Sequence, residues 1–170
     1  MALITLNKLA LPTGSVLQVV SATKSDTLSA STAVFVDVTG LSLSITPSSS
    51  SNKIFLVCNI NIDGSERYMG VKFVRGSTDI GIGDADGNRT RLTVSSMRNH
   101  NPTGDNYVMH NSSASFLDTP NTTSATTYKI KAGLHYGNAQ TLYINRPDYD
   151  DTATYVARGI STLTAYEIKA

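Results

Sequence analysis

The stretch LSLSITPSSSSNKIFLV, residues 41–57, places two apolar patterns on either side of a polar run. Up to Ile45, apolar and small polar residues alternate, which predicts a β-strand with one buried face. The segment KIFLVCNINI, from Lys53 onward, is apolar on both faces in its middle, which is typical of a central strand buried between two layers. Between them, Pro47 and four serines have the composition of a solvated loop. We therefore expect a crossover between two sheets here, with a flexible linker as the alternative.

Similar short segments recur along the rest of the chain. Alternation continues in SVLQVVSAT (residues 15–23), STAVFVDV (31–38) and ERYMGVKFVRG (66–76). Further strand candidates are TDIGIG, RLTVSSM, SASFLDT, TTYKIKAGLHY, QTLYINR and ISTLTAYEI. The pattern predicts an all-β protein of about ten or eleven short strands, with little or no helix.

Turn residues fall between most of these segments. We expect turns at VTG (residues 38–40), IDG (62–64), DADGN (84–88), NPTG (101–104) and YGN (136–138). No gap is long enough for a helical crossover between parallel strands, so the predicted architecture is an antiparallel sandwich or barrel.

Composition limits the classes of partner. Charged residues make up 16% of the chain and the formal net charge is +1, so nothing favours nucleic acid or an acidic membrane as partner. The single cysteine, Cys58, lies in an apolar run and is expected to be a buried hydrophobic residue. No segment is long and apolar enough to predict a transmembrane helix, and no signal peptide is predicted.

The first thirteen residues are unusually apolar for a free terminus, and we expect an arm over residues 1–13 followed by a single domain over residues 14–170. We interpret the arm as an anchor that docks the domain onto a larger assembly. Its apolar residues are Leu3, Ile4, Leu6, Leu9 and Leu11.

The sequence carries no recognisable catalytic or metal-binding motif. The three histidines lack ligand spacing, no GxSxG elbow occurs, and the Asp84–Asn88 loop fails the calcium consensus. The acidic run RPDYDD is interpreted as an exposed loop, although cation binding there stays open. We therefore predict no enzyme activity, no cofactor and no metal, while a catalytic triad assembled by the fold stays an alternative.

Tyrosines near predicted loops are the best candidates for contact with a partner or a sugar, because their rings are amphipathic. Tyr68, Tyr128, Tyr143, Tyr155 and Tyr166, by contrast, are expected to serve packing. The residues proposed for partner contact are Arg98, His100, Tyr107, His110, Tyr136 and Tyr149.

An ordered set of segments resembles a family of small virion proteins, described as tail-fibre-like, from phages of marine and freshwater bacteria. The segments are GSVLQVVSATKSDTLS, VDVTGLSLSITPSSSSNKIFLV, VKFVRGSTDIGIGDADGNRTR, SFLDTPNTTSATTYKIKA and TLYINRPDYDDTATYVARGISTLTAYEI. The resemblance covers nearly everything after Gly14 and departs from the usual pattern over residues 96–113.

The resemblance implies a jelly-roll-like β-sandwich, similar to the trimeric jelly rolls of the complement and tumour necrosis factor superfamily. It implies a non-enzymatic homotrimer on the virion surface, assembled in the host cytoplasm, that acts as head decoration, cement or a short knob. The alternative is a tail-fibre tip that binds a host glycan, and an enzyme such as a glycan depolymerase is a hypothesis from another class. The expected partners are the chain itself and capsid or tail proteins, and the hydroxyl-rich strands would line the three-fold interface.

Overall fold

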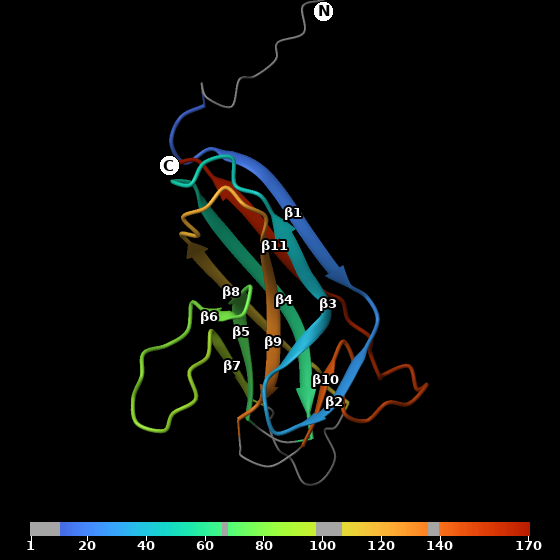
Figure 1. Cartoon of the computed structure of the whole chain (residues 1–170). Helices are drawn as coiled ribbons and strands as arrows, with labels where there is room; N and C mark the ends of the chain where they lie inside the picture. Colours follow the sequence, from blue (N-terminus) through green and yellow to red (C-terminus); the bar gives the residue numbers. More distant parts are fainter. Residues whose placement is uncertain (1–10, 66–67, 98–106, 136–139) are drawn as a thin grey trace, which may run out of the picture.

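The computed structural model describes residues 11–65, 68–97, 107–135 and 140–170, and these ranges contain eleven strands and no helix (Figure 1). The all-β prediction is therefore confirmed. The strands are β1 (Val16–Lys24), β2 (Leu28–Thr32), β3 (Val36–Ile45), β4 (Lys53–Gly64), β5 (Tyr68–Arg75), β6 (Thr78–Ile80), β7 (Val94–Met97), β8 (His110–Asp118), β9 (Thr126–Leu134), β10 (Gln140–Ile144) and β11 (Ser161–Ile168).

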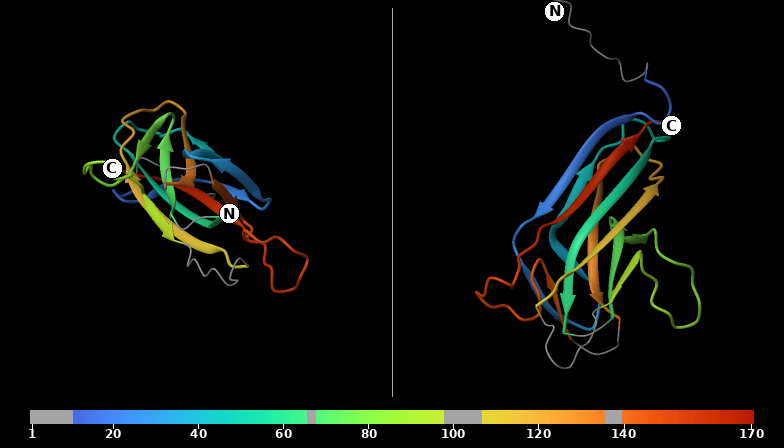
Figure 2. Two further views of the ribbon diagram at one scale, coloured as in Figure 1. Left: turned by 90° about the horizontal axis from the view of Figure 1, so that it is seen from below. Right: turned by 180° about the vertical axis from the view of Figure 1, so that it is seen from behind.

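The strands form two antiparallel sheets that pack face to face (Figure 2). Sheet A has the order β1-β11-β4-β10-β2, with β8 paired to β4. Sheet B has the order β3-β9-β5-β6, with β7 also paired to β5. The predicted antiparallel sandwich is the observed architecture.

The pairing of the strands is nested. β1 pairs with β11, β2 with β10, β3 with β9, β4 with β8, and β5 with β7. The chain is thus one long hairpin, with β6 at its tip, that is rolled up so that its successive pairs are divided between the two sheets. This topology is the jelly roll. Because the outermost pair joins Val16 to Ile168, the C-terminus lies beside the start of β1.

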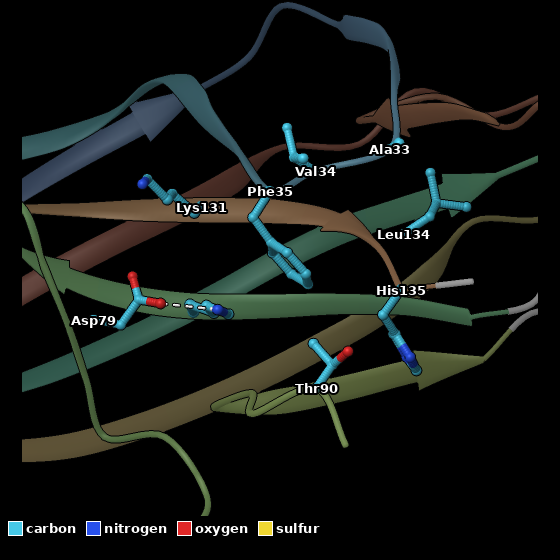
Figure 3. Close-up of a pocket in the computed structure, with 9 residues that line it drawn as sticks. Ala33, Val34, Phe35, Asp79, Thr90, Lys131, Leu134 and His135 are labelled. Atoms are coloured by element: carbon cyan, nitrogen blue, oxygen red, sulfur yellow. Dashed lines mark hydrogen bonds and ion pairs between the residues drawn. The ribbon is translucent and has the colours of Figure 1, made fainter. Parts of the chain in front are cut away.

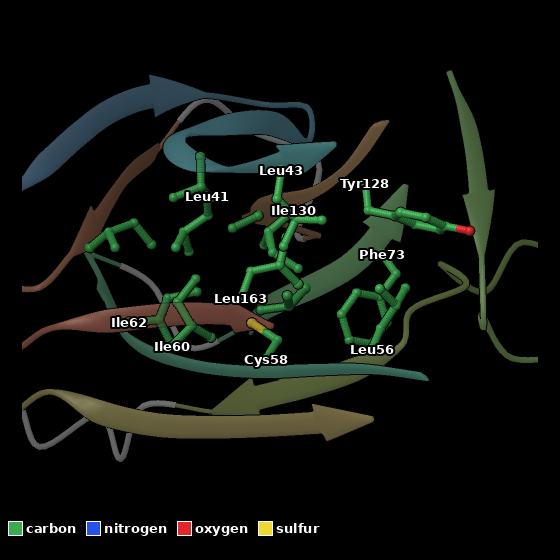
Figure 4. Packing of buried hydrophobic residues seen from close by; sticks show 14 of the residues in the cluster. Leu41, Leu43, Leu56, Cys58, Ile60, Ile62, Phe73, Tyr128, Ile130 and Leu163 are labelled. Carbon is green, nitrogen blue, oxygen red and sulfur yellow. The ribbon is translucent and has the colours of Figure 1, made fainter. Parts of the chain in front are cut away.

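The core lies between the sheets and follows the alternation of β4. Ile54, Leu56, Cys58, Ile60 and Ile62 point inward and are buried against the apolar residues of sheet B (Figure 4). Burial leaves Cys58 only 1% exposed and raises the pKa of its thiol to about 12. The prediction that Cys58 is a buried hydrophobic residue is confirmed.

The serine run crosses between the sheets, as predicted, because it joins β3 of sheet B to β4 of sheet A. The buried carboxylate of Glu167 holds this crossover. It accepts hydrogen bonds from the Ser48 amide (2.6 Å), the Ser48 hydroxyl (2.7 Å), Asn52 Nδ2 (2.6 Å) and Gln18 Nε2 (2.7 Å). Burial acts to raise the pKa of Glu167, but these hydrogen bonds outweigh it and leave that pKa below its ordinary value. The run therefore serves structure.

A second buried carboxylate links the two sheets. Asp118, at the end of β8, accepts a 2.6 Å hydrogen bond from the hydroxyl of Tyr128 in β9. It also pairs with Arg75 of β5, at 2.9 Å from the Nη1 atom to either carboxylate oxygen. Burial, followed by the hydrogen bond to Asp118, raises the pKa of Tyr128. This bridge joins β8 of sheet A to two strands of sheet B.

Three local predictions are wrong. The strand expected over residues 31–38 is interrupted at residues 33–35, and β2 was not expected. The VTG turn lies inside β3, where Gly40 has a φ of 91° and the register with β9 shifts between Asp37 and Ser42. The IDG turn lies inside β4, because β10 pairs with Ile62, Asp63 and Gly64 and extends the ladder.

The prediction for β4 itself needs a correction. β4 is central in sheet A, with β8 on one side and β11 and β10 on the other. Sheet B covers only its inner face, however, so Phe55 and Val57 point outward and are half-buried rather than enclosed between two layers.

Candidate functional site

The connection between β10 and β11, residues 145–160, is a loop whose ends are held together at Asn145. This residue is fully buried and has a φ of 61°, a conformation that asparagine tolerates better than most residues. Its Nδ2 donates to the carbonyls of Lys24 (2.8 Å) and Asp26 (2.9 Å), and its Oδ1 accepts from the Ser161 hydroxyl at 2.6 Å. The Gly159 amide donates to the Asn145 carbonyl at 3.2 Å, which closes the loop.

Charged groups fix the first turn of this loop. The Asp148 amide donates to the buried Asp63 carboxylate at 2.7 Å, and Arg146 Nη2 donates to the Asp148 carbonyl at 2.8 Å. Asp150 pairs with both Arg146 and Arg158, and its hydrogen bond to Arg158 lowers the pKa of Asp150. The charges at the base therefore neutralise one another while the outer part of the loop stays exposed.

Three tyrosines meet beside this loop. The Tyr107 ring lies 4.9 Å from that of Tyr149 and 5.2 Å from that of Tyr155, both in edge-to-face geometry. Tyr149 is 45% exposed and Tyr155 is 64% exposed. We call Tyr107, Tyr149 and Tyr155 the tyrosine cluster. Its mutual ring contacts orient the rings while leaving much of their surface in solvent.

The chemistry of the tyrosine cluster suits binding rather than catalysis. The Tyr149 hydroxyl donates to Asp151 Oδ2 at 3.4 Å, and the charge of Asp151 is the largest of the effects that raise the pKa of Tyr149. The phenol of Tyr149 is therefore neutral at pH 7. Neutral phenols offer apolar faces together with hydroxyl groups that can donate or accept hydrogen bonds.

The structure brings together two of the residues proposed for partner contact, Tyr107 and Tyr149. His110 is the half-buried first residue of β8 and pairs with Ile62. Leu11 is half-buried, and its carbonyl accepts a hydrogen bond from Lys169 Nζ, which ties the base of the arm to the end of the chain. The remaining residues proposed for contact or docking lie outside the described ranges: Arg98, His100, Tyr136, Leu3, Ile4, Leu6 and Leu9.

Tyr155 was missed by the sequence analysis, which expected it to serve packing. It lies in the same loop as Tyr149, but its contact with Tyr107 depends on how that loop is placed by Asn145 and Asp63. The acidic, turn-rich composition of residues 147–152 marks the loop as exposed. If the predicted loop had been extended to residue 155, Tyr155 would have been recognised as an exposed loop tyrosine.

A hollow of about 450 Å³ lies over the outer side of sheet B (Figure 3). Its lining includes Phe35, Lys72, Asp79 and His135. Lys72 Nζ lies 2.8 Å from Asp79 and 4.7 Å from the centre of the Phe35 ring, so this cation is already engaged. Burial lowers the pKa of His135. Asp79 is the only carboxylate among the described residues of the lining, whereas glycoside cleavage needs a pair.

The described residues contain no group of three or more histidine, cysteine, aspartate or glutamate side chains placed to hold a metal ion. In the two acidic loops, Asp86 pairs with Arg89, and Asp150 pairs with Arg146 and Arg158. Over the described ranges, no helix has the length and apolar character to cross a membrane.

Comparisons with known proteins give only distant similarity. No protein-family model and no curated protein matches the sequence. Among solved structures, the chain is similar to "Structure of infectious bursal disease virus Gt strain" (15% identity, TM-score 0.40) and "Structure of infectious bursal disease virus Gx strain" (13%, 0.43). It is also similar to "Crystal structure of infectious bursal disease virus VP2 subviral particle" (15%, 0.39).

Each of these matches covers 100% of this chain but only 42 to 43% of the other, so the chain spans about two fifths of their length. Similarity at this level does not extend to function, which has to be argued from the surfaces and buried groups of this chain.

Proposed function

We propose that this chain is a non-enzymatic structural protein of a bacteriophage particle, displayed on its surface as a homotrimer. The observation that carries the proposal is how the buried polar groups are used. Glu167 holds the serine crossover, Asp118 joins the two sheets, and Asn145 closes the longest described loop. These buried polar side chains thus stabilise the sandwich. This use is expected of a protein that acts through contacts at its surface. The resemblance of the ordered segments to small virion proteins also supports the proposal.

Within this role we favour head decoration, cement or a short knob. The apolar residues of the arm would dock the domain onto the particle, and the tie between Leu11 and Lys169 fixes where the arm leaves the sandwich. A partner that binds only the assembled shell stabilises that shell by mass action.

Immunogold electron microscopy of the phage that encodes the chain tests this proposal. Label on the head supports decoration, label on the tail supports the fibre alternative, and particles without label would overturn the virion role. Replacing Leu3, Ile4, Leu6 and Leu9 by serine should abolish incorporation without unfolding the domain. Replacing Asn7 and Lys8 by serine is the matched control, and equal incorporation of both variants would contradict a docking arm.

The tyrosine cluster favours one second candidate function, a receptor-binding tip for a host glycan. Exposed tyrosine rings can stack on the apolar face of a sugar, and three copies in a trimer would raise avidity. On a glycan array, Tyr149→Ala and Tyr155→Ala should each weaken binding by about tenfold or more. Tyr68→Ala, at an exposed tyrosine outside the tyrosine cluster, should bind normally. Binding that survives both cluster variants would remove this candidate.

A further inference from the structure

The outward side chains of β1, β11, β4 and β8 stand in registered rows across sheet A. We call the positions in the rows named below the sheet A outer face, and none of them is Asp, Glu, Lys or Arg; Lys53, at the start of β4, lies beyond these rows, in register with Ile168. The rows are Val19–Tyr166–Phe55–Leu117, Ser21–Thr164–Val57–Ser115 and Thr23–Thr162–Asn59–Ser113, followed by the pair Asn61–Asn111.

The first row is an apolar band that crosses all four strands. Val19 and Leu117, at its two ends, are 53% and 45% exposed. Phe55 and Tyr166 lie between them with ring centroids 6.2 Å apart, and Val57 continues the apolar surface into the next row. An antiparallel sheet that faces water ordinarily carries polar residues on its outer side. This band is the pattern of a surface that is covered in the working assembly.

The pattern of β4 supports the same conclusion. Its apolar run from Ile54 to Cys58 predicts a strand covered on both faces, yet sheet B covers only the inner one. The outer positions, Phe55 and Val57, are then the residues that a second layer would bury. The opposite sheet of the same chain is already used on the inner side, and the described ranges contain no further strand that could form such a layer.

We propose that the sheet A outer face is bound by a second copy of this chain. The inference rests on the proposed homotrimer and assigns the interface that the sequence left open. The rows beyond the apolar band consist largely of serine, threonine and asparagine, whose side chains both donate and accept hydrogen bonds. Such a face can meet another copy without like-charge repulsion and without burying an unpaired charge.

The area of the sheet A outer face can be compared with the area that a stable interface buries. Three rows across four strands and one pair make fourteen positions, which at about 4.8 Å between strands and about 6.7 Å between rows cover roughly 450 Å². A stable interface needs about 800 Å² on each partner. The sheet A outer face is therefore the centre of the contact rather than all of it, and a charge placed in its apolar band should have a large effect.

Native mass spectrometry and light scattering at micromolar concentration test the assignment. Leu117→Lys should convert the trimer to a monomer, or raise the concentration needed for assembly at least tenfold. Val34→Lys is the matched control, since Val34 is 65% exposed and lies in the bend before β3, so this variant should stay trimeric. Circular dichroism checks that both variants fold. A folded Leu117→Lys variant that assembles like the wild type would overturn the assignment.

A smaller change gives a second measurement. Ser115→Cys places a thiol in the middle of the sheet A outer face, and Ser44→Cys places one at an exposed position of β3. The native Cys58 is buried and should not react. Labelling of Ser115→Cys should slow at least tenfold as the protein is concentrated into its assembled range, while labelling of Ser44→Cys stays constant.

The outcomes separate the two proposals. A trimer in which both engineered thiols react equally fast would remove this interface and leave the trimer standing. A wild-type protein that stays monomeric at every micromolar concentration would remove the homotrimer and the interface together.

Discussion

The outer faces of the two sheets differ in charge although they belong to the same sandwich. On sheet B, Asp37 pairs with Lys129 at 2.7 Å and Lys72 pairs with Asp79 at 2.8 Å, all from strands whose outer side faces solvent. The sheet A outer face carries no charged side chain, and the exposed Lys53 lies beyond it at the start of β4. Because interface centres are depleted in charge, the difference supports the proposed interface on sheet A.

Sheet A has charged residues, but it uses them differently. Each one in its strands lies within two residues of a strand end or points inward, and those with described partners hold loops or join the sheets. These residues are Lys24, Lys53, Asp63, Asp118 and Glu167. Charges of sheet A should therefore matter for folding, whereas charges of sheet B should matter chiefly for solubility. Removing a charged side chain is therefore expected to lower the free energy of unfolding more in sheet A than in sheet B.

The largest effect is expected at Asp118. Asp118→Ala leaves the Tyr128 hydroxyl buried without its acceptor and leaves Arg75 without its counter-charge. The free energy of unfolding should fall by about 3 kcal/mol, measured by urea denaturation.

The Tyr128→Phe variant separates the causes of that loss. By itself it should cost only about 1 kcal/mol, because Asp118 keeps its pair with Arg75. In combination with Asp118→Ala it should recover part of the loss, because no buried hydroxyl is then left without a partner. A cost below about 1 kcal/mol for Asp118→Ala would show that the sheets are joined by apolar packing alone.

Glu167 should give an intermediate effect that depends on pH. Its pKa is lower in the folded chain than the ordinary value of 4.5, so ionisation of Glu167 stabilises the fold above that pH. The contribution is lost as the pH falls below 4.5 and through the folded pKa. Glu167→Gln should cost about 1 to 3 kcal/mol at pH 7 and should flatten the acid limb of stability against pH, followed by denaturation at several pH values.

Asp37→Asn, at an exposed ion pair of sheet B, is the matched control for Glu167→Gln. It should keep the acid limb of the wild type and change the stability at pH 7 by less than about 1 kcal/mol. If both variants lose the acid limb equally, the carboxylates of the two sheets do not differ in the way proposed.

Much of the fold follows from local pattern. The alternation from Leu41 to Ile45 and the apolar run after Lys53 predicted two sheets joined by the serine crossover, and the structure has this arrangement. Local pattern failed where pairing with a distant strand decides the outcome. Gly40 belongs to a segment with the composition of a turn. Because the residues on either side of it pair with β9, it lies inside β3, at the point where the register shifts.

The surfaces were harder to predict than the strands, for the same reason. Alternation alone shows only which side of its own strand each of Val19, Phe55 and Leu117 occupies. Only the register across β1, β11, β4 and β8 shows that they form one band with Tyr166. The tyrosine cluster likewise depends on the placement of a loop by Asn145, whose hydrogen bonds reach a turn far away in sequence.

The smallest effect is expected on the outer side of sheet B. Lys129→Met removes the pair with Asp37 but keeps most of the aliphatic stem that packs on the sheet. The free energy of unfolding should change by less than about 1 kcal/mol, and less still at 1 M salt, because exposed ion pairs are weak and screened. Native mass spectrometry should find the same trimer as in the wild type. A loss above about 2 kcal/mol, or dissociation of the trimer, would show that sheet B depends on its outer charges and would erase the contrast between the two faces.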